Sequence, residues 1–540
     1  MPFDWTNPYR TIRTPVFARN VVATSHPLAA QAGLRMLLDG GNAVDAVLAA
    51  AAALTVVEPV SNGLGGDAFA ILWDGNRLRG LNSSGVAPAA WNLEFFRKRH
   101  SEDDEGLAKI PVRGWDTVTV PGCVAAWEAL HERFGSLPLA RILEPAASIA
   151  ERGVTVAPVV AGKWAEAAPV LRDYPGWART FMPGGRAPRI GEKFVFPGAA
   201  KLLRLLAEKG LREFYEGAVA EAVGTWAKKT GGALTAEDMR DFRPEWVTPV
   251  SMEYHGYELH ELPPNGQGIA ALIALGILKH FDLPALEPDS PESQHLQIEA
   301  MKLAFADIRR YVGEPKTMTV TPRQILNPDY LARRAKSIDP RKASFPVAGI
   351  FPSGGTVYLA AADEKGMMVS FIQSNYMGFG SGIVEPEYGI SLQNRGTAFS
   401  ADPASANVVA PGKRPFHTII PAFLTQNGKP RMSFGVMGAD VQPQGHVQTL
   451  IRMLDYRQQP QAACDAPRFK INRDFSVNIE SRADPSLGPA LEAMGHKIHI
   501  DPLYHGESGS GQFIWRLSDD PDHGYVAASD TRRDGCACGF

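Results

Sequence analysis

A threonine directly after two glycines, at the start of a predicted strand, has the clearest potential for nucleophilic chemistry in this sequence. The stretch is Gly354-Gly355-Thr356, followed by VYLAAAD. If the chain is cut before Thr356, the free α-amine can take the proton of the threonine's own hydroxyl. An α-amine titrates near ~8, so much of it is neutral at physiological pH. The alternative is that the glycines end a loop and Thr356 is simply a good strand former.

A second hydroxyl is brought to the same strand start by the predicted hairpin. The segment DEKG, residues 363–366, has the residue preference of a type I turn. Pairing around its two central residues places Gln373 opposite Thr356, and Ser374 beside Gly355 and Thr356. Ser374 could then orient the nucleophile by a hydrogen bond, or it could merely end a strand.

The elements that must position these residues are of mixed type. The first third of the chain alternates strands and helices, and residues 43–57 predict a buried, alanine-rich helix. Residues 137–299 show mostly helical spacing, and a long amphipathic helix is expected to end before Pro315. Residues 324–355 are polar and contain prolines, which suits an exposed processing linker. Strands dominate from Thr356 onward, so we expect sheets covered by helices.

The bulk composition excludes several classes of protein. The chain has 540 residues, 45% hydrophobic and 21% charged, with a net charge of −3, so nothing favours nucleic acid or membrane as a partner. The N-terminal residues lack a secretory signal pattern. Cys536 and Cys538 form a lone CxC motif without further metal ligands, and four cysteines give no disulfide framework. We expect a soluble, reduced, cytoplasmic protein.

Motifs of other enzyme classes give no competing interpretation. The sequence has no HExxH, GxSxG or P-loop motif, so zinc protease, serine hydrolase and NTPase chemistry lack support. The glycine-rich segment GLGGDAF is not a dinucleotide fingerprint and is expected to allow close backbone packing.

Many ordered blocks resemble the γ-glutamyltranspeptidase family over nearly the whole chain. They include GGNAVDAVLAAAAALTVVEPVSNGLGGDAF, VTVPGCVAAWEAL, ELPPNGQGIAAL, GTVYLAAADEKGMMVSF, APGKRPFHTIIPAF and FGVMGADVQPQGH. The resemblance implies an α+β fold, the four-layer αββα sandwich of the Ntn hydrolases. It also implies self-cleavage between Gly355 and Thr356 into a large subunit, 1–355, and a small subunit, 356–540. The two pieces would stay associated as one catalytic domain that needs no cofactor or metal, and this heterodimer could assemble into a homo-oligomer.

Position by position, the resemblance assigns a catalytic centre. Thr356 matches the family's autoprocessing and catalytic threonine, and Ser374 matches its second threonine. Gly438 and Ala439 match the glycine pair whose backbone N–H groups form the oxyanion hole. An alanine is tolerable in the second position if its φ is negative, because the donor is backbone.

Two charged contacts of the glutathione-using members are missing. Ser84 stands where those members hold the α-carboxylate with an arginine, and Ala398 stands where an acid holds the α-amino group. The α-amino-acid clamp is therefore absent from this chain.

Other side chains enter the same positions. Arg395 replaces a glutamine, and its rigid fork suits a carboxylate, although a structural ion pair is the alternative. His417 and Thr418 replace a serine pair, and His417 could equally be a satisfied core histidine. Tyr376 replaces a binding asparagine, with Asn375 one residue earlier. These five positions, with Ser84, form the predicted substrate pocket.

This pattern is similar to the family's non-glutathione branch, which includes oxamate amidohydrolase and cephalosporin acylases. We therefore expect a self-processing amidohydrolase that cleaves a small carboxylated, oxamate-like amide through an acyl-enzyme. One alternative is a γ-glutamyltransferase, glutathione hydrolase or β-lactam side-chain acylase. A second, of another class, is an uncleaved pseudoenzyme that only binds a ligand.

Overall fold

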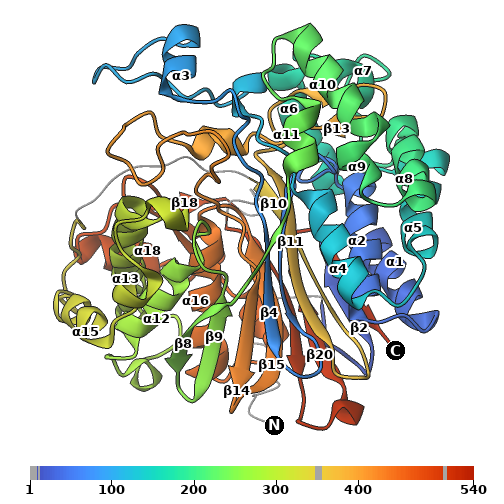
Figure 1. Ribbon diagram of the computed structural model, residues 1–540. Helices are drawn as coiled ribbons and strands as arrows, with labels where there is room; N and C mark the ends of the chain where they lie inside the picture. The colour runs from blue at the N-terminus through green and yellow to red at the C-terminus, as the bar shows by residue number, and fades with distance from the viewer. Residues whose placement is uncertain (1–8, 10–12, 347–354, 503–507) are drawn as a thin grey trace.

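Two seven-stranded antiparallel sheets form the centre of the molecule, which is seen here in a computed structural model that describes residues 9, 13–346, 355–502 and 508–540 (Figure 1). The β10 sheet has the order β21 (Cys536–Gly539), β2 (Val21–Thr24), β10 (Gly355–Ala362), β11 (Met368–Tyr376), β3 (Asp67–Trp73), β4 (Leu78–Ser83) and β7 (Glu245–Val247). The β15 sheet has the order β1 (Val16–Ala18), β20 (Tyr525–Ser529), β19 (Ser510–Arg516), β15 (Lys429–Met437), β14 (Ala422–Gln426), β9 (Tyr257–Glu261) and β8 (Val250–Tyr254).

Helices cover the outer face of each sheet, on the two sides of Figure 1. Those over the β10 sheet are α1 (Pro27–Leu38), α2 (Ala43–Val57), α4 (Cys123–Phe134), α5 (Leu139–Arg152), α6 (Pro158–Leu171), α7 (Trp177–Phe181), α8 (Pro197–Lys209), α9 (Glu213–Glu216), α10 (Ala218–Thr230) and α11 (Ala236–Asp241). Those over the β15 sheet are α12 (Ile269–Leu278), α13 (Pro291–Tyr311), α14 (Pro322–Ile325), α15 (Pro328–Lys336), α16 (Val441–Leu454), α17 (Pro460–Asp465) and α18 (Leu487–Ala493). The predicted four-layer αββα sandwich is confirmed.

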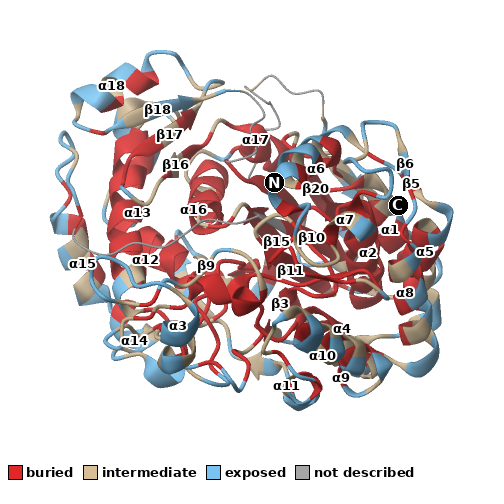
Figure 2. Cartoon of the chain, turned by 90° about the horizontal axis from the view of Figure 1, so that it is seen from above, coloured by how far each residue is buried: buried red, intermediate tan, exposed pale blue. Residues whose placement is uncertain are grey.

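The alternation of side chains along the central strands builds two separate apolar layers. On β10, Leu359 and Ala361 pack against the helices, whereas Tyr358 and Ala360 pack between the two sheets. Both faces of this strand are therefore buried, and Figure 2 shows the same burial through the middle of the molecule. A strand that begins at Gly355 inside this stack is fixed by packing on both sides.

The predicted alanine-rich helix is α2, and its boundaries agree with the prediction. Every residue of α2 is buried. Asn42 caps it, and the Asp45 carboxylate accepts the Asn42 N–H at 2.9 Å, so the one acid in this apolar run serves the helix start. No helix in the described part of the chain is long and apolar enough to cross a membrane.

The expectation of a featureless linker over 324–355 was wrong in its first part. Helix α15 and the end of α14 occupy it, and their Ile325 and Leu331 side chains are buried against the β15-sheet helices. Residues 347–354, the part next to the predicted cut, lie outside the described residues. The remaining elements include α3 (Leu93–Arg99) and the three-stranded ribbon β16 (Phe469–Ile471), β17 (Val477–Glu480) and β18 (Ile498–Asp501).

The register of the β10–β11 hairpin differs by one residue from the prediction. Ala362 pairs with Met368 rather than Met367, because Gly366 adopts a φ of 89° and adds a residue to the loop. Val357 pairs with Gln373 and Gly355 with Tyr376, so a bulge lies between these two pairs.

Candidate active site

The start of β10 lies opposite the bulge of β11. Because of the corrected register, Ser374 and Asn375 lie across from position 356, nearer than the prediction placed Ser374. Ser374 is buried, and its Oγ accepts a hydrogen bond from the backbone N–H of Tyr376 at 2.8 Å. The backbone of Thr356 belongs to β10, while its side chain lies outside what the structure describes.

The backbone donor pair follows the end of β15, immediately before α16. Gly438 has a φ of 129° and Ala439 a φ of 53°, so the negative φ that would make the alanine tolerable is not found. A left-handed alanine costs roughly 1–2 kcal/mol, and the Gln267 side chain restrains it by donating to the Ala439 carbonyl at 2.8 Å. Within the described residues, neither N–H of the pair donates a backbone hydrogen bond. Both remain available for one acceptor.

Arg395 is a fully buried cation with unused donors. Its Nη1 donates to Thr418 Oγ1 at 2.8 Å, and its guanidinium lies 4.3 Å from the centre of the Tyr376 ring. Within the described chain, its Nε and Nη2 have no hydrogen-bond partner. Burial lowers the pKa of this group to about 10, although the charge of Asp67 opposes the shift. The group therefore stays protonated at neutral pH, with two N–H groups left for an anion.

Asp67 supplies the negative charge of the site, and the sequence analysis missed it. Its carboxylate accepts from the backbone N–H groups of Gly85 and Gly122 and from Gln393 Nε2, at 2.8–3.0 Å. Burial raises the pKa of Asp67 to about 6, against the opposing effect of Arg395. The signal in the sequence was the aspartate in GLGGDAF, where only the glycines were interpreted.

His417 is a satisfied buried histidine. Its Nδ1 accepts the Ile419 N–H at 3.3 Å, so its Nε2 carries the proton and donates to Asp67 Oδ2 at 3.0 Å. Burial, and then the field of Arg395, hold the pKa of His417 well below its usual value. Of the two alternatives left open for this residue, the contacts favour the structural one, with both ring nitrogens committed.

The two positions of the absent clamp carry no charge in the structure either. Ser84 is buried, and its Oγ accepts from Asn265 Nδ2 at 3.0 Å. Ala398 ends the short 3₁₀ helix that begins with Arg395. Its carbonyl accepts a hydrogen bond from the Asn407 side chain. Thus no acid or base at these positions replaces the missing side chains.

The remaining predicted residues lie around the same strand ends. Tyr376 ends β11 with a φ of 77°, and its ring lies beneath the Arg395 guanidinium. Asn375 is buried, its Nδ2 donates to the Ser391 carbonyl at 3.4 Å, and its Oδ1 has no partner within the described residues. Gly65 and Gly66 pack closely behind it, as the sequence predicted, because a Cβ at Gly66 would lie 2.5 Å from the Asn375 side chain.

One further cluster of polar side chains, centred on Lys302, is already saturated. Lys302 Nζ donates to Glu299 at 2.9 Å and to His496 Nδ1 at 3.0 Å, and His496 is 2.8 Å from His295. An ammonium thus lies among the three side chains that could otherwise hold a metal ion. This cluster is a hydrogen-bonded network between α13 and His496, which lies between α18 and β18.

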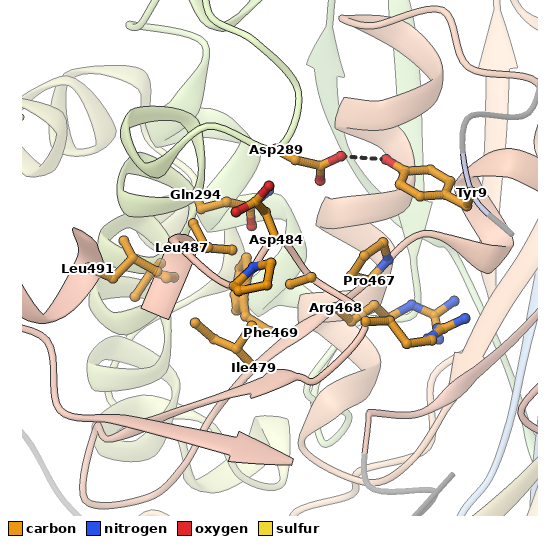
Figure 3. Close-up of a pocket in the computed structure, with 14 residues that line it drawn as sticks. Tyr9, Asp289, Gln294, Pro467, Arg468, Phe469, Ile479, Asp484, Leu487 and Leu491 are labelled. Carbon is orange, nitrogen blue, oxygen red and sulfur yellow. Dashed lines mark hydrogen bonds between the residues drawn. The ribbon is translucent and has the colours of Figure 1, made fainter. Parts of the chain in front are cut away.

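A cavity of about 410 Å³ lies between α13, α18 and the β16–β17 strands (Figure 3). Its floor is apolar, with Phe469 and Leu491. At its rim the Tyr9 hydroxyl donates to Asp289 at 2.7 Å, and Arg452 donates to the same carboxylate at 2.6 Å. None of its lining residues belongs to the group around Arg395 and Ala439.

Comparison with known proteins assigns the family. The sequence profile of the Gamma-glutamyltranspeptidase family matches residues 29–540. The chain belongs to this family. It is therefore an enzyme of the N-terminal nucleophile hydrolase class, as the resemblance implied.

Its relatives lie in the branch that the altered pocket indicated. The chain is 34% identical to the Glutathione hydrolase-like YwrD proenzyme of Bacillus subtilis, over 98% of this chain and 100% of that one. It is 35% identical to the Oxamate amidohydrolase proenzyme of Klebsiella pneumoniae, over 97% and 99%. The crystal structure of cephalosporin acylase from Bacillus halodurans matches with a TM-score of 0.93 and 46% identity, over 100% and 99%.

Proposed function

We propose that this γ-glutamyltranspeptidase-family enzyme is a self-processing amidohydrolase of small amides that carry a carboxylate on the acyl side, with oxamate as the leading candidate. The observation that carries the proposal is the pair of unused N–H groups on the buried Arg395. The guanidinium of an arginine can bind a planar carboxylate with two parallel hydrogen bonds.

The chemistry requires only groups of the polypeptide. Cleavage between Gly355 and Thr356 frees the threonine α-amine, which takes the hydroxyl proton as Oγ attacks the amide carbon. The N–H groups of Gly438 and Ala439 stabilise the oxyanion. The amine then leaves with that proton and the acyl group stays on Oγ as an ester. Water attacks the ester, the carboxylic acid departs, and the threonine hydroxyl is restored.

The two products of cleavage would remain one body. In the β10 sheet, β10 and β11 of the small piece lie between β2 and β3 of the large piece. Separation would expose unpaired strand edges and both apolar layers. A stable heterodimer is therefore expected after cleavage, as the proenzyme names of two relatives also suggest.

A β-lactam side-chain acylase is the second candidate. It is favoured by the 46% identity to cephalosporin acylase. Its acyl group can also present a carboxylate to Arg395. A glutathione hydrolase is less favoured, because Ser84 and Ala398 cannot bind the charges of an α-amino acid.

The test combines intact mass with a substrate screen. Purified protein should contain two N-termini, one of them Thr356, and should release ammonia from oxamate faster than from acetamide. A glutaryl amide and γ-glutamyl-p-nitroanilide test the alternatives. Active protein with only one N-terminus would contradict self-processing, and an intact, inactive chain that still binds oxamate would identify the pseudoenzyme.

A further inference from the structure

A second unsaturated arginine lies beside the backbone donor pair. Asp440 follows Ala439 directly, and its Oδ2 is 3.6 Å from the Nε of Arg473. This distance is too long for a hydrogen bond. Arg473 belongs to the loop between β16 and β17, so two segments far apart in the sequence meet next to the site.

Arg473 keeps unused hydrogen-bonding capacity in this pair. Within the described residues, Arg473 Nε and Nη2 are buried without a hydrogen-bond partner. Burial lowers the pKa of Arg473, against the effect of Asp440. The neighbouring Arg482, by contrast, donates to Glu480 at 3.1 Å. If Arg473 served only to neutralise Asp440, we would expect it to form a hydrogen-bonded ion pair with Asp440 in the same way.

The loop that carries Arg473 is held rigidly. Asn472 and Ser476 pair through a backbone hydrogen bond of 2.8 Å, and the Asp474 carboxylate accepts the Ser476 N–H at 3.1 Å. From α13, Arg309 donates to the Arg473 carbonyl at 3.1 Å. The arginine backbone is therefore fixed before any ligand arrives, which lowers the entropic cost of binding.

Arg395 and Arg473, the two arginines with unused donors, differ in how deeply they are buried. Arg395 is fully buried, whereas the Arg473 side chain is 26% exposed. Burial raises the pKa of the Tyr376 hydroxyl, and Asp440 raises it further. Arg395 and Arg473 both oppose that rise, so both cations act on the same phenol. Tyr376 therefore experiences the charge of one fully buried and one partly exposed cation.

We propose that Arg473 binds a carboxylate on the amine component of those substrates that carry one, so that such an amide reacts faster than the matching amide without that carboxylate. The inference rests on the proposed function for the assignment of Arg395 to the acyl side. The acyl group occupies the enclosed inner position, and the amine component must leave toward solvent, where Arg473 lies. Asp440, 3.6 Å away, attracts the guanidinium by its charge and forms no hydrogen bond with it, so the Nε and Nη2 donors remain for the carboxylate.

The test compares two substrates that differ only in the amine component. N-phenyloxamate releases aniline, and N-(4-carboxyphenyl)oxamate releases 4-aminobenzoate, so chromatography of the amines gives kcat/KM for each. Arg473→Gln should lower the ratio of the carboxylated to the uncarboxylated substrate about ten- to a hundredfold, as expected for one charged contact. Arg473→Lys should restore part of it, and Arg482→Gln, the matched control, should leave it unchanged. An unchanged ratio in Arg473→Gln overturns the inference.

Equilibrium binding separates this inference from the proposed function. Calorimetry with 4-aminobenzoate and with aniline requires no turnover. Preferential binding of 4-aminobenzoate that Arg473→Gln removes supports the inference, even if neither oxamate is hydrolysed and the proposed acyl donor is wrong. Equal affinity for the two amines, or a preference that survives Arg473→Gln, overturns the inference even if oxamate is a substrate.

Discussion

Two groups of buried arginines in this molecule have opposite hydrogen-bonding states. Arg532 donates to Glu480 and Asp530 at 2.5–3.1 Å and to backbone carbonyls, and Arg468 also donates to Asp530, at 2.9 Å. Arg395 has one side-chain hydrogen bond and two unused nitrogens within the described chain. The first group is complete without a ligand, and the second is not.

The pKa shifts of the two groups follow this difference. Burial alone would raise the pKa of Glu480, but Arg532 outweighs it and holds the value at about 2. Burial raises the pKa of Asp67 to about 6, and Arg395 opposes the shift without cancelling it. Saturated ion pairs therefore stabilise their own charges, whereas the site keeps charges that only a ligand would fully compensate.

The largest expected effect is that of Thr356→Ala, which should abolish activity without destabilising the fold. Thr356→Ala should leave one 540-residue chain with no measurable amidase activity, because nucleophile and processing residue are lost together. Its thermal midpoint should stay close to that of the wild type. Intact mass, an ammonia assay and calorimetry check this. Two chains in the variant would contradict the assignment of Thr356.

Arg395→Gln tests the unsaturated group. For a carboxylated amide, kcat/KM should fall by about two to four orders of magnitude, since two charge-assisted contacts at ~1.5–3 kcal/mol each are lost. An uncharged amide should lose much less, and stability should change little, because a buried cation with unused donors is removed. Equal losses on both amides would refute the pocket assignment.

Arg532→Gln tests the saturated group. Removing one partner of a buried ion network should lower the free energy of unfolding by about 3–5 kcal/mol. The ratio of activities on carboxylated and uncharged amides should stay as in the wild type. Denaturant unfolding and paired kinetics measure the two quantities. If Arg532→Gln changed the preference between carboxylated and uncharged amides without lowering stability, the contrast between the two groups of arginines would not hold.

The pH dependence of stability should reveal Asp67. Its folded pKa of about 6 lies above the unfolded value near ~3.9, so the folded protein binds this proton more tightly. The contribution of Asp67 to stability is therefore highest below pH ~4 and falls, by up to about 3 kcal/mol, as the pH rises to about 6. The difference in unfolding free energy between wild type and Asp67→Asn should follow this curve. A flat difference between pH 4 and 7 would show that Asp67 is ionised throughout.

The smallest expected effect concerns Ser374. Ser374→Ala should lower kcat on the order of ten- to a hundredfold without unfolding the protein, because one orienting hydrogen bond is lost. Unchanged turnover, measured at saturating substrate, would show that Ser374 only shapes the bulge of β11.

Local sequence patterns predicted much of the fold, and the exceptions have identifiable causes. The helix α2 was predicted from its apolar, alanine-rich composition. The strand that begins at Gly355 was predicted from the two glycines that precede Thr356. The hairpin register was missed by one residue because Gly366 adds a left-handed position to the loop. The sequence left the φ of Ala439 open, and a side chain from Gln267, 172 positions earlier in the chain, holds it at positive φ.

The sequence by itself determined the types of residue and the family pattern: a threonine behind two glycines, a serine on the partner strand, and an arginine where the α-amino-acid clamp is lost. Only the tertiary structure decided which charges are satisfied. The sequence favoured Arg395 as a ligand and left His417 open between a ligand and a core residue; in the structure Asp67 engages His417, and two nitrogens of Arg395 are unused within the described residues. The reason is physical, since hydrogen-bond saturation depends on neighbours from distant segments that local periodicity does not encode.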